Sequence, residues 1–265
     1  MKIAILGCGQ MGETMLKGFL YSKVFKSEDF TLTTKFDDHE AQLRSKYPDT
    51  MITQDNGLAI KDADIVILAV NPDAAKEVLV PLKEQLKSKL LVSICAGITL
   101  EKLEEWTDCT RLVRAMPNIP CGIGEGTIAL VYSKKSTSED NKVVKDLFAH
   151  LGMCIPIDEK QMNTVTALAA SGPAFAFVIL EALADGAVMM GLSRQLAAKL
   201  TAQMFQGSAR LLLETGEHPA ALKDQVTTPG GITTAGLLEM EDGKIRSTLA
   251  KTIQKASSRA HKLVE

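Results

Sequence analysis

The chain has 265 residues, 46% of them hydrophobic and 23% charged, so it can bury one large core or two modest ones. Thirty basic and 32 acidic residues leave a net charge of −2, which gives no overall field to recruit nucleic acid or an acidic membrane surface. The composition therefore favours small-molecule chemistry, with neither nucleic acid nor membrane as a partner.

A glycine-rich turn follows the first predicted strand. Gly7 permits a tight turn, Gly9 lets the backbone approach a pyrophosphate, and Gly12 lets the next helix pack closely on the strand. The helix N-terminus then offers free N–H groups to the anion. This pattern predicts a dinucleotide site, although an ordinary turn between strand and helix stays open on the motif alone. The predicted contacts are Gly7, Gly9, Gln10, Met11 and Gly12.

Short β-rich runs alternate with amphipathic segments over residues 1–158. Several runs are continuously apolar, as in strands buried on both faces of a parallel sheet. We therefore predict an α/β fold with an N-terminal Rossmann-type doubly wound sheet. The clearest predicted strands are Lys2–Leu6, Phe30–Thr34, Ile65–Val70, Leu90–Ile94, Arg111–Ala115, Thr127–Tyr132 and Cys154–Ile157.

The end of the second predicted strand indicates the type of dinucleotide. In NAD-binding domains an acid at this place accepts hydrogen bonds from the ribose 2′-OH. Here Thr34 and Lys35 come first, and Asp37 and Asp38 follow later. A hydroxyl and a lysine suit a 2′-phosphate, which a carboxylate would repel, so NADPH is favoured. NADH stays open, because a short loop can return Asp37 to the ribose, and Lys35 can be a solvated loop lysine.

Further cofactor contacts are expected at the carboxyl ends of later strands, where a parallel sheet places its ligand crevice. Asn118 is the polar group expected to face that crevice. Asn56 either contacts the adenosine or caps the helix that it precedes. The remaining predicted contacts are small residues that also suit ordinary turns: Ala69, Val70, Asn71, Pro72, Cys95 and Ala96.

The five cysteines are scattered and include no CxxC pair. No histidine stands near them at ligand spacing, so no metal site is predicted. An odd number cannot pair completely within one chain, and the first apolar run, Ile3–Leu6, is too short for a signal peptide. We therefore expect reduced thiols and a cytoplasmic protein.

Helical patterns replace the strands beyond Asp158. We predict two domains, a dinucleotide-binding domain over 1–158 and an all-helical substrate and dimerisation domain over 159–265. Helices of roughly 20 residues reach about 30 Å, and such long apolar helices are expected to interweave in a dimer. The predicted helices are Met162–Met190, broken at Gly172-Pro173 by the missing proline N–H, then Arg194–Glu214, Pro219–Gln225, a segment from near Thr233, and Ile245–Val264.

The run Val165–Leu180 is apolar enough to be considered as a membrane span. Pro173 interrupts it, Glu181 and Asp185 follow at once, and no aromatic belt or basic flank marks an interface. We therefore expect a helix buried in a core or a subunit interface.

A second glycine motif lies in the helical part, where Val226–Thr233 leads into a helix. Glycines that open a helix point backbone N–H groups and hydroxyls at one spot, which suits a carboxylate or a phosphate. The alternative is an interhelical turn with Thr233 or a neighbour as N-cap. The chain offers no His–Asp pair at an obvious spacing, and imine reduction needs mainly a positioned hydride donor.

At these residues the chain resembles the pyrroline-5-carboxylate reductase family. The resemblance rests on Gly7–Met11, Val165–Phe175 and Leu222–Thr233, and it extends over nearly the whole chain. It implies NAD(P)H-dependent reduction of the cyclic imine L-1-pyrroline-5-carboxylate to L-proline, the last step of proline biosynthesis. It also implies an intertwined homodimer that often assembles into a decamer, a pentamer of dimers.

The resemblance also implies roles for single residues. Backbone N–H groups around Gly231 and Ile232 would hold the substrate carboxylate, together with Gly230 and the Thr228 hydroxyl. The Thr233 hydroxyl would reach the ring nitrogen and is the expected catalytic group. The hydride would come from nicotinamide lying near Ala96 and Asn118.

The chain departs from the family pattern at two places. Asn71 stands where many members have lysine, which removes a positive charge near the cofactor phosphates, and Phe175 stands where many have tyrosine.

Two other functions stay open. A β-hydroxyacid dehydrogenase would carry a lysine general acid on the first long helix, and Val165–Val188 contains none. A non-catalytic NADP sensor would not need the Thr228–Thr233 loop.

Overall fold

The protein is described by a computed structural model that covers residues 1–261. Its contacts divide the chain into two compact units. The first, here the sheet unit, comprises Met1–Ser171 and, among the described residues, those from Ala256 to His261. The second, here the helical unit, is Gly172–Lys255. The predicted domain boundary at 158 lies earlier than this division, directly after the last strand.

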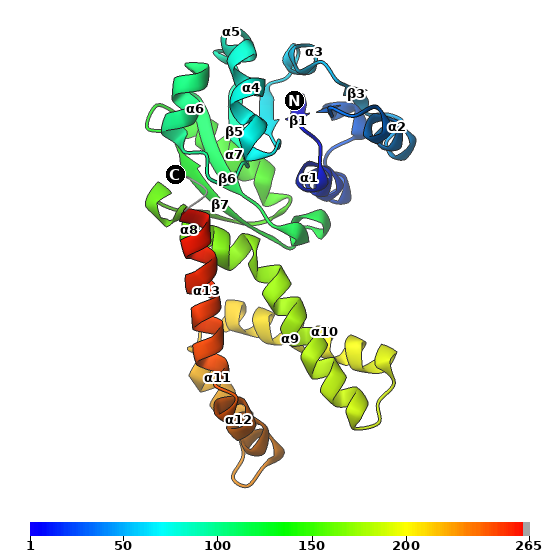
Figure 1. Ribbon diagram of the computed structural model, residues 1–265, viewed down its shortest axis with the longest axis vertical. Coiled ribbons are helices and arrows are strands. Elements are labelled where there is room, and N and C mark those ends of the chain that lie inside the picture. Colours follow the sequence, from blue (N-terminus) through cyan, green and yellow to red (C-terminus); the bar gives the residue numbers. More distant parts are fainter. Residues whose placement is uncertain (262–265) are drawn as a thin grey trace. The chain divides into compact units, whose positions relative to one another are not determined.

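The sheet unit is built on one eight-stranded sheet with the order β3-β2-β1-β4-β5-β6-β7-β8 (Figure 1). Strands β1 to β6 run parallel, β7 pairs antiparallel with β6, and β8 pairs parallel with β7. This order confirms the predicted Rossmann-type fold. The strands are β1 Ile3–Leu6, β2 Phe30–Thr33, β3 Met51–Thr53, β4 Ile65–Leu68, β5 Leu90–Ser93, β6 Leu112–Met116, β7 Gly126–Tyr132 and β8 Gly152–Pro156.

All seven predicted strands are present, and one was missed. β3 has three residues, of which only Ile52 is buried, so it carries too short an apolar pattern to be recognised. The antiparallel direction of β7 was also not predicted, because a mainly apolar run is compatible with either direction.

Helices cover both faces of the sheet, and alternate residues of β1 pack against the helices of opposite faces. Ile3 and Ile5 pack into one buried cluster with residues of α1, α2 and α7, whereas Ala4 and Leu6 pack into a second with residues of α3 to α6. These helices are α1 Gln10–Tyr21, α2 Asp37–Lys46, α3 Asn56–Ile60, α4 Ala75–Leu79, α5 Lys83–Leu86, α6 Leu100–Thr107, α7 Ser138–Ala149 and α8 Met162–Val165, with 3₁₀ turns at Ser27–Asp29, Pro72–Ala74, Val80–Leu82, Ile119–Ile123 and Glu159–Gln161.

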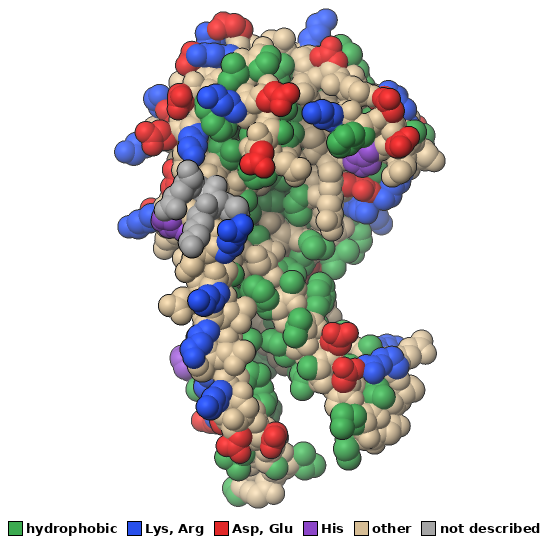
Figure 2. Space-filling view, in the orientation of Figure 1, with side chains coloured by type: hydrophobic (Ala, Val, Ile, Leu, Met, Phe, Trp, Pro, Cys, Tyr) green, Lys and Arg blue, Asp and Glu red, His purple; other side chains and the backbone are tan. Residues whose placement is uncertain are grey.

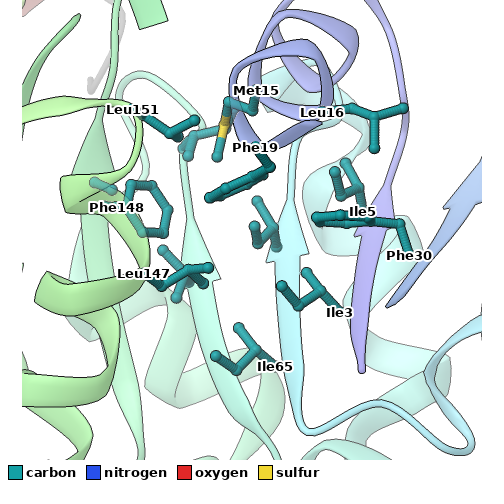
Figure 3. Packing of buried hydrophobic residues seen from close by; sticks show 14 of the residues in the cluster. Ile3, Ile5, Met15, Leu16, Phe19, Phe30, Ile65, Leu147, Phe148 and Leu151 are labelled. Carbon is teal, nitrogen blue, oxygen red and sulfur yellow. The ribbon is translucent and has the colours of Figure 1, made fainter. Parts of the chain in front are cut away.

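Phe19 of α1 is at the centre of the first cluster (Figure 3). Its ring stacks on Phe30 at 5.5 Å between centroids and meets the edge of Phe148 at 6.2 Å. These contacts fix α1 to the sheet through β2 and α7, and they therefore hold the turn between β1 and α1 in place.

The helical unit contains α9 Gly172–Met189, α10 Arg194–Thr215, α11 Pro219–Gln225, α12 Ile232–Asp242 and most of α13 Ile245–His261. The predicted break before Pro173 is confirmed, since a π-helical turn at Thr166–Ala170 and a bend at Ser171 precede α9. The predicted last helix starts as expected at Ile245, and its residues 262–264 lie outside the described part of the chain.

Candidate functional site

The turn between β1 and α1 has the backbone that the glycine motif requires. Gly7 has φ +76°, and a Cβ there would overlap Val70 Cγ1 and lie 2.9 Å from Val70 Cα. The Gly7 N–H donates to Thr33 Oγ1 at 2.9 Å, and the Cys8 N–H donates to the Thr33 carbonyl at 2.6 Å. These bonds place the turn directly beside the end of β2.

Helix α1 begins with free N–H groups. Its N-cap is Gly9, and within residues 1–261 no side chain caps it. A Cβ on Gly9 would meet no atom within 4 Å, so this side of the turn is open, whereas a Cβ on Gly12 would lie 3.2 Å from Ile5 Cγ2. The open Gly9, the close-packed Gly12 and the uncapped helix together fit the pyrophosphate of a dinucleotide.

Two ionisable side chains at this turn, Cys8 and Glu13, have shifted pKa values. Burial, and to a lesser extent the Glu13 carboxylate, raises the pKa of the Cys8 thiol to about 12, so the thiol stays protonated. Burial also acts to raise the pKa of Glu13, but hydrogen bonds from Lys46 and Tyr47 outweigh it and the pKa is lowered. The Glu13 carboxylate is therefore an anion paired with Lys46 and Lys17.

The end of β2 brings together a threonine and a histidine. Thr34 is 6% exposed, and its Oγ1 lies 2.9 Å from Nδ1 of His39 on α2. Lys35 is exposed beside them. Asp37 is the first residue of α2, where its carboxylate accepts a hydrogen bond from Gln54. Sequence reasoning assigned no role to His39, because only the fold of α2 brings its ring to Thr34.

Asn56 opens α3 but does not cap it. The cap is Asp55, whose Oδ1 accepts a hydrogen bond from the Leu58 N–H at 3.0 Å. The capping alternative for Asn56 is therefore wrong. Its contact with the adenosine stays a prediction.

The ends of β4 and β5 are joined by a thiol. Cys95 Sγ donates to the carbonyl of Val70 at 3.2 Å, and burial raises its pKa to about 11. Ala69 lies against the α1 turn, since a Cβ on Gly12 would be 3.5 Å from Ala69 Cβ. The structure thus brings Ala69, Val70 and Cys95 together beside the turn. Asn71 and Pro72 are exposed, and Ala96 is half-buried.

Asn118 has a structural role that the sequence did not predict. It is 7% exposed, its Nδ2 donates to the carbonyl of Ala169 at 3.0 Å, and its Oδ1 accepts from the Thr127 N–H at 3.0 Å. The expectation that this amide faces the crevice is corrected, because both of its ends are engaged inside the sheet unit. A contact with nicotinamide stays a prediction for the backbone around it.

A buried arginine was missed by sequence reasoning. Arg114 of β6 is 3% exposed, and its Nη1 donates to Glu159 Oε1 at 3.0 Å. The same oxygen accepts the N–H of Leu100, the first residue of α6, at 2.8 Å. Burial lowers the pKa of Arg114, and the Glu159 carboxylate opposes that shift. The Arg114–Glu159 pair thus holds the segment between β5 and α6 in place at Leu100.

The glycine motif of the helical unit also ends at an uncapped helix. Gly230 has φ +66°, and the Gly231 N–H donates to the Thr228 carbonyl at 3.0 Å. Gly231 is the N-cap of α12, and none of the described side chains caps that end. The Thr234 hydroxyl donates to the Thr228 carbonyl at 3.3 Å, whereas no hydrogen bond of the Thr233 hydroxyl is found among residues 1–261. The N-cap is therefore a neighbour of Thr233 and not Thr233 itself, so the interpretation as an interhelical turn stays open.

Within the described residues, no group of three or more His, Cys, Asp or Glu side chains could hold a metal ion.

Two family models match this chain, one over its N-terminal part and one over its C-terminal part. A family model described as NADP oxidoreductase, coenzyme F420-dependent, matches residues 2–97, and one described as pyrroline-5-carboxylate reductase dimerisation matches residues 159–263. The second match begins where the predicted second domain begins. Fold and site thus define a dinucleotide-binding oxidoreductase with a helical dimerisation domain.

Full-length relatives give the family. The chain is 36% identical to pyrroline-5-carboxylate reductase of Arabidopsis thaliana over 263 residues, covering 99% of this chain and 95% of the relative. It is also 36% identical to that of Methanosarcina acetivorans, covering 99% and 97%. The pyrroline carboxylate reductase of Plasmodium falciparum, solved with NADP bound, superposes with a TM-score of 0.89 at 32% identity, covering 100% and 98%. The chain belongs to the pyrroline-5-carboxylate reductase family.

One helical stretch, Glu159–Met189, is long and apolar enough to cross a membrane by length and composition alone, and 11% of its apolar window is buried. A helix that packs against another copy of the chain meets the same criterion. The stretch lies within the residues matched by the dimerisation model. Its assignment to a subunit interface stays a prediction.

Proposed function

We propose that this chain reduces L-1-pyrroline-5-carboxylate to L-proline with NADPH. The observation that carries the proposal is the Thr228–Gly231 turn, which opens α12 with unpaired N–H groups in a chain that also has an open dinucleotide turn. Full-length relatives with this printed name support the substrate, and the NADP-bound relative supports the cofactor. The activity is the last step of proline biosynthesis.

The sheet unit holds the dinucleotide in this proposal. Gly7, Gly9 and the first N–H groups of α1, at Gln10, Met11 and Gly12, bind the pyrophosphate. Thr34 and Lys35 bind the 2′-phosphate, and Asn56 contacts the adenosine. The segments that line the nicotinamide and its ribose are Ala69, Val70, Asn71, Pro72, Cys95, Ala96 and the backbone at Asn118.

The Thr228–Thr233 loop holds the substrate. The free N–H groups around Gly231 and Ile232, at the first turn of α12, bind the carboxylate with the Thr228 hydroxyl, and Gly230 supplies the left-handed turn that aims them. The Thr233 hydroxyl hydrogen-bonds the ring nitrogen and orients the C=N bond. Bound NADPH supplies a hydride to the imine carbon, and the nitrogen of the protonated imine keeps its proton in the product. The reduction therefore needs no general acid at the nitrogen, and positioning of the hydride donor carries the step.

We further infer that the chain acts as a homodimer in the cytoplasm and that the dimers assemble into a decamer. The dimerisation match and the exposed apolar side chains of the helical unit support the dimer. Five free cysteines support a reducing compartment.

Thr233→Ala tests the proposal. We expect kcat to fall by roughly 100-fold, as for loss of one group that stabilises a transition state, while NADPH affinity stays unchanged. Thr233→Ser keeps the hydroxyl and should keep most of the rate. Full turnover in Thr233→Ala would remove this residue from the mechanism.

A further inference from the structure

We propose that His39 is a specificity-determining residue that, through Thr34, selects NADPH over NADH. The inference rests on the proposed function, since it concerns the cofactor of that reaction. The inference extends the proposed function to a residue that neither the sequence pattern nor the comparisons assign. The observation behind it is the 2.9 Å contact between Thr34 Oγ1 and His39 Nδ1.

The place of this pair is defined by the glycine turn. Thr33 accepts the N–H groups of Gly7 and Cys8, so the end of β2 adjoins the pyrophosphate turn. Thr34 is the next residue, at the position from which this fold reads the 2′ substituent of the ribose. The half-buried His39 contacts Thr34 and therefore lies beside the position of the 2′ substituent, which distinguishes the two dinucleotides.

Hydrogen-bond accounting explains what His39 does. A threonine hydroxyl has one hydrogen, and an imidazole has two nitrogens that take different roles. When Nδ1 accepts the Thr34 hydrogen, Nε2 carries the ring hydrogen and is a donor. When His39 is cationic, Nδ1–H donates to Thr34 and frees the hydroxyl hydrogen for another acceptor. Both arrangements present donors to a 2′-phosphate, whose oxygens only accept when it is fully ionised.

The acids of the same helix turn are held by other partners. Gln54 Nε2 donates to both Asp37 and Glu40, and Arg44 forms an ion pair with Glu40. These bonds lower the pKa of Glu40, the Gln54 bond most. Asp38 is exposed. Gln54 thus holds one oxygen of the Asp37 carboxylate within the helix turn, while Lys35 and His39 are the basic side chains next to Thr34.

Direct binding measurements test the proposal, with NADPH and NADH titrated separately into the full-length protein and followed by calorimetry. His39→Leu should weaken NADPH binding roughly 10- to 100-fold, as expected for lost hydrogen bonds to a charged group, and leave NADH binding within about 2-fold. His39→Gln keeps one polar contact and should fall between the wild type and His39→Leu. His150→Gln, a histidine packed on Phe25, is the control and should change neither affinity.

Equal weakening of both nucleotides, or no change in either, would overturn the assignment of His39. If the wild-type protein prefers NADPH and reduces the imine while His39→Leu keeps that preference, only this inference fails. If the wild type binds neither nucleotide, the proposed function fails as well.

Discussion

The sheet unit buries its apolar side chains within one chain, whereas the helical unit leaves most of its own on the surface. Both faces of the sheet carry closed clusters of buried residues. In the described part of the helical unit, the buried hydrophobic residues are only Ala184 and Ala197. Figure 2 shows hydrophobic side chains along the surface of the helices. The sheet unit therefore has a core within one chain, whereas the helical unit has an apolar surface that suits a partner.

The two units share one local backbone arrangement at their proposed binding turns. Each has a glycine at positive φ before an uncapped helix, Gly7 before α1 and Gly230 before α12. A neighbour fixes each turn: Val70 packs against Gly7, and Thr228 accepts the Gly231 N–H. Each proposed anion site thus consists of one short segment, and different neighbours support it in the two units.

Val178→Glu on α9 should have the largest effect. Val178 is 65% exposed in the single chain, and we expect a second copy to cover it, so the substitution would bury a charge at that contact. We expect the oligomer to dissociate, measured by light scattering after gel filtration. Val24→Glu, at a valine 60% exposed in the sheet unit, is the control. Unchanged mass in both variants would contradict the interface.

Gly7→Ala should come second. Positive φ costs about 1–3 kcal/mol for a non-glycine residue, and the added Cβ overlaps Val70. We expect a lower melting temperature and lost nucleotide binding. Gly9→Ala, where a Cβ meets nothing within 4 Å, should keep the melting temperature and weaken the nucleotide alone. Equal melting temperatures for all three proteins would contradict this account of the turn.

Gly231→Ala makes the corresponding change in the helical unit. The new Cβ would overlap Thr228 Oγ1 and lie 3.0 Å from the Thr228 carbonyl oxygen. We expect the substrate KM to rise roughly 10- to 100-fold through weakened bonds to the carboxylate, with NADPH affinity unchanged. Gly236→Ala, inside α12 with no atom within 4 Å of a Cβ, is the matched control. An unchanged KM in Gly231→Ala would contradict the proposal that the substrate carboxylate binds at this turn.

The smallest expected effect is on acid stability of the sheet unit. Burial acts to raise the pKa of Asp140, but hydrogen bonds to its carboxylate from the Arg111 guanidinium and the Thr137 N–H outweigh it and the pKa is lowered. A lowered folded-state pKa stabilises the fold above the unfolded value, about 3.9, and this contribution is lost as the pH falls below it. As the pH is lowered from 7 to 3, the melting temperature should therefore fall more steeply for the wild type than for Asp140→Asn. Parallel curves would contradict the pairing.

Local patterns predicted the fold better than they predicted the contacts of single side chains. The glycine turn and the buried strands are encoded within a few neighbouring residues, so both were predicted. His39 and Arg114 were missed because their partners, Thr34 and Glu159, become neighbours only through folding. Arg114 did leave one signal, since a charge inside an apolar strand indicates a buried pair. Asn118 was misplaced for the same reason, because Ala169 and Thr127 are remote in sequence.

The most direct test is to measure NADPH consumption by the wild-type protein with L-1-pyrroline-5-carboxylate as sole acceptor and to identify proline as product. A parallel assay with NADH compares the two cofactors. The account predicts one proline formed for each NADPH oxidised and a higher kcat/KM with NADPH than with NADH. Tight binding of NADPH without any proline would contradict it and would favour a non-catalytic nucleotide sensor.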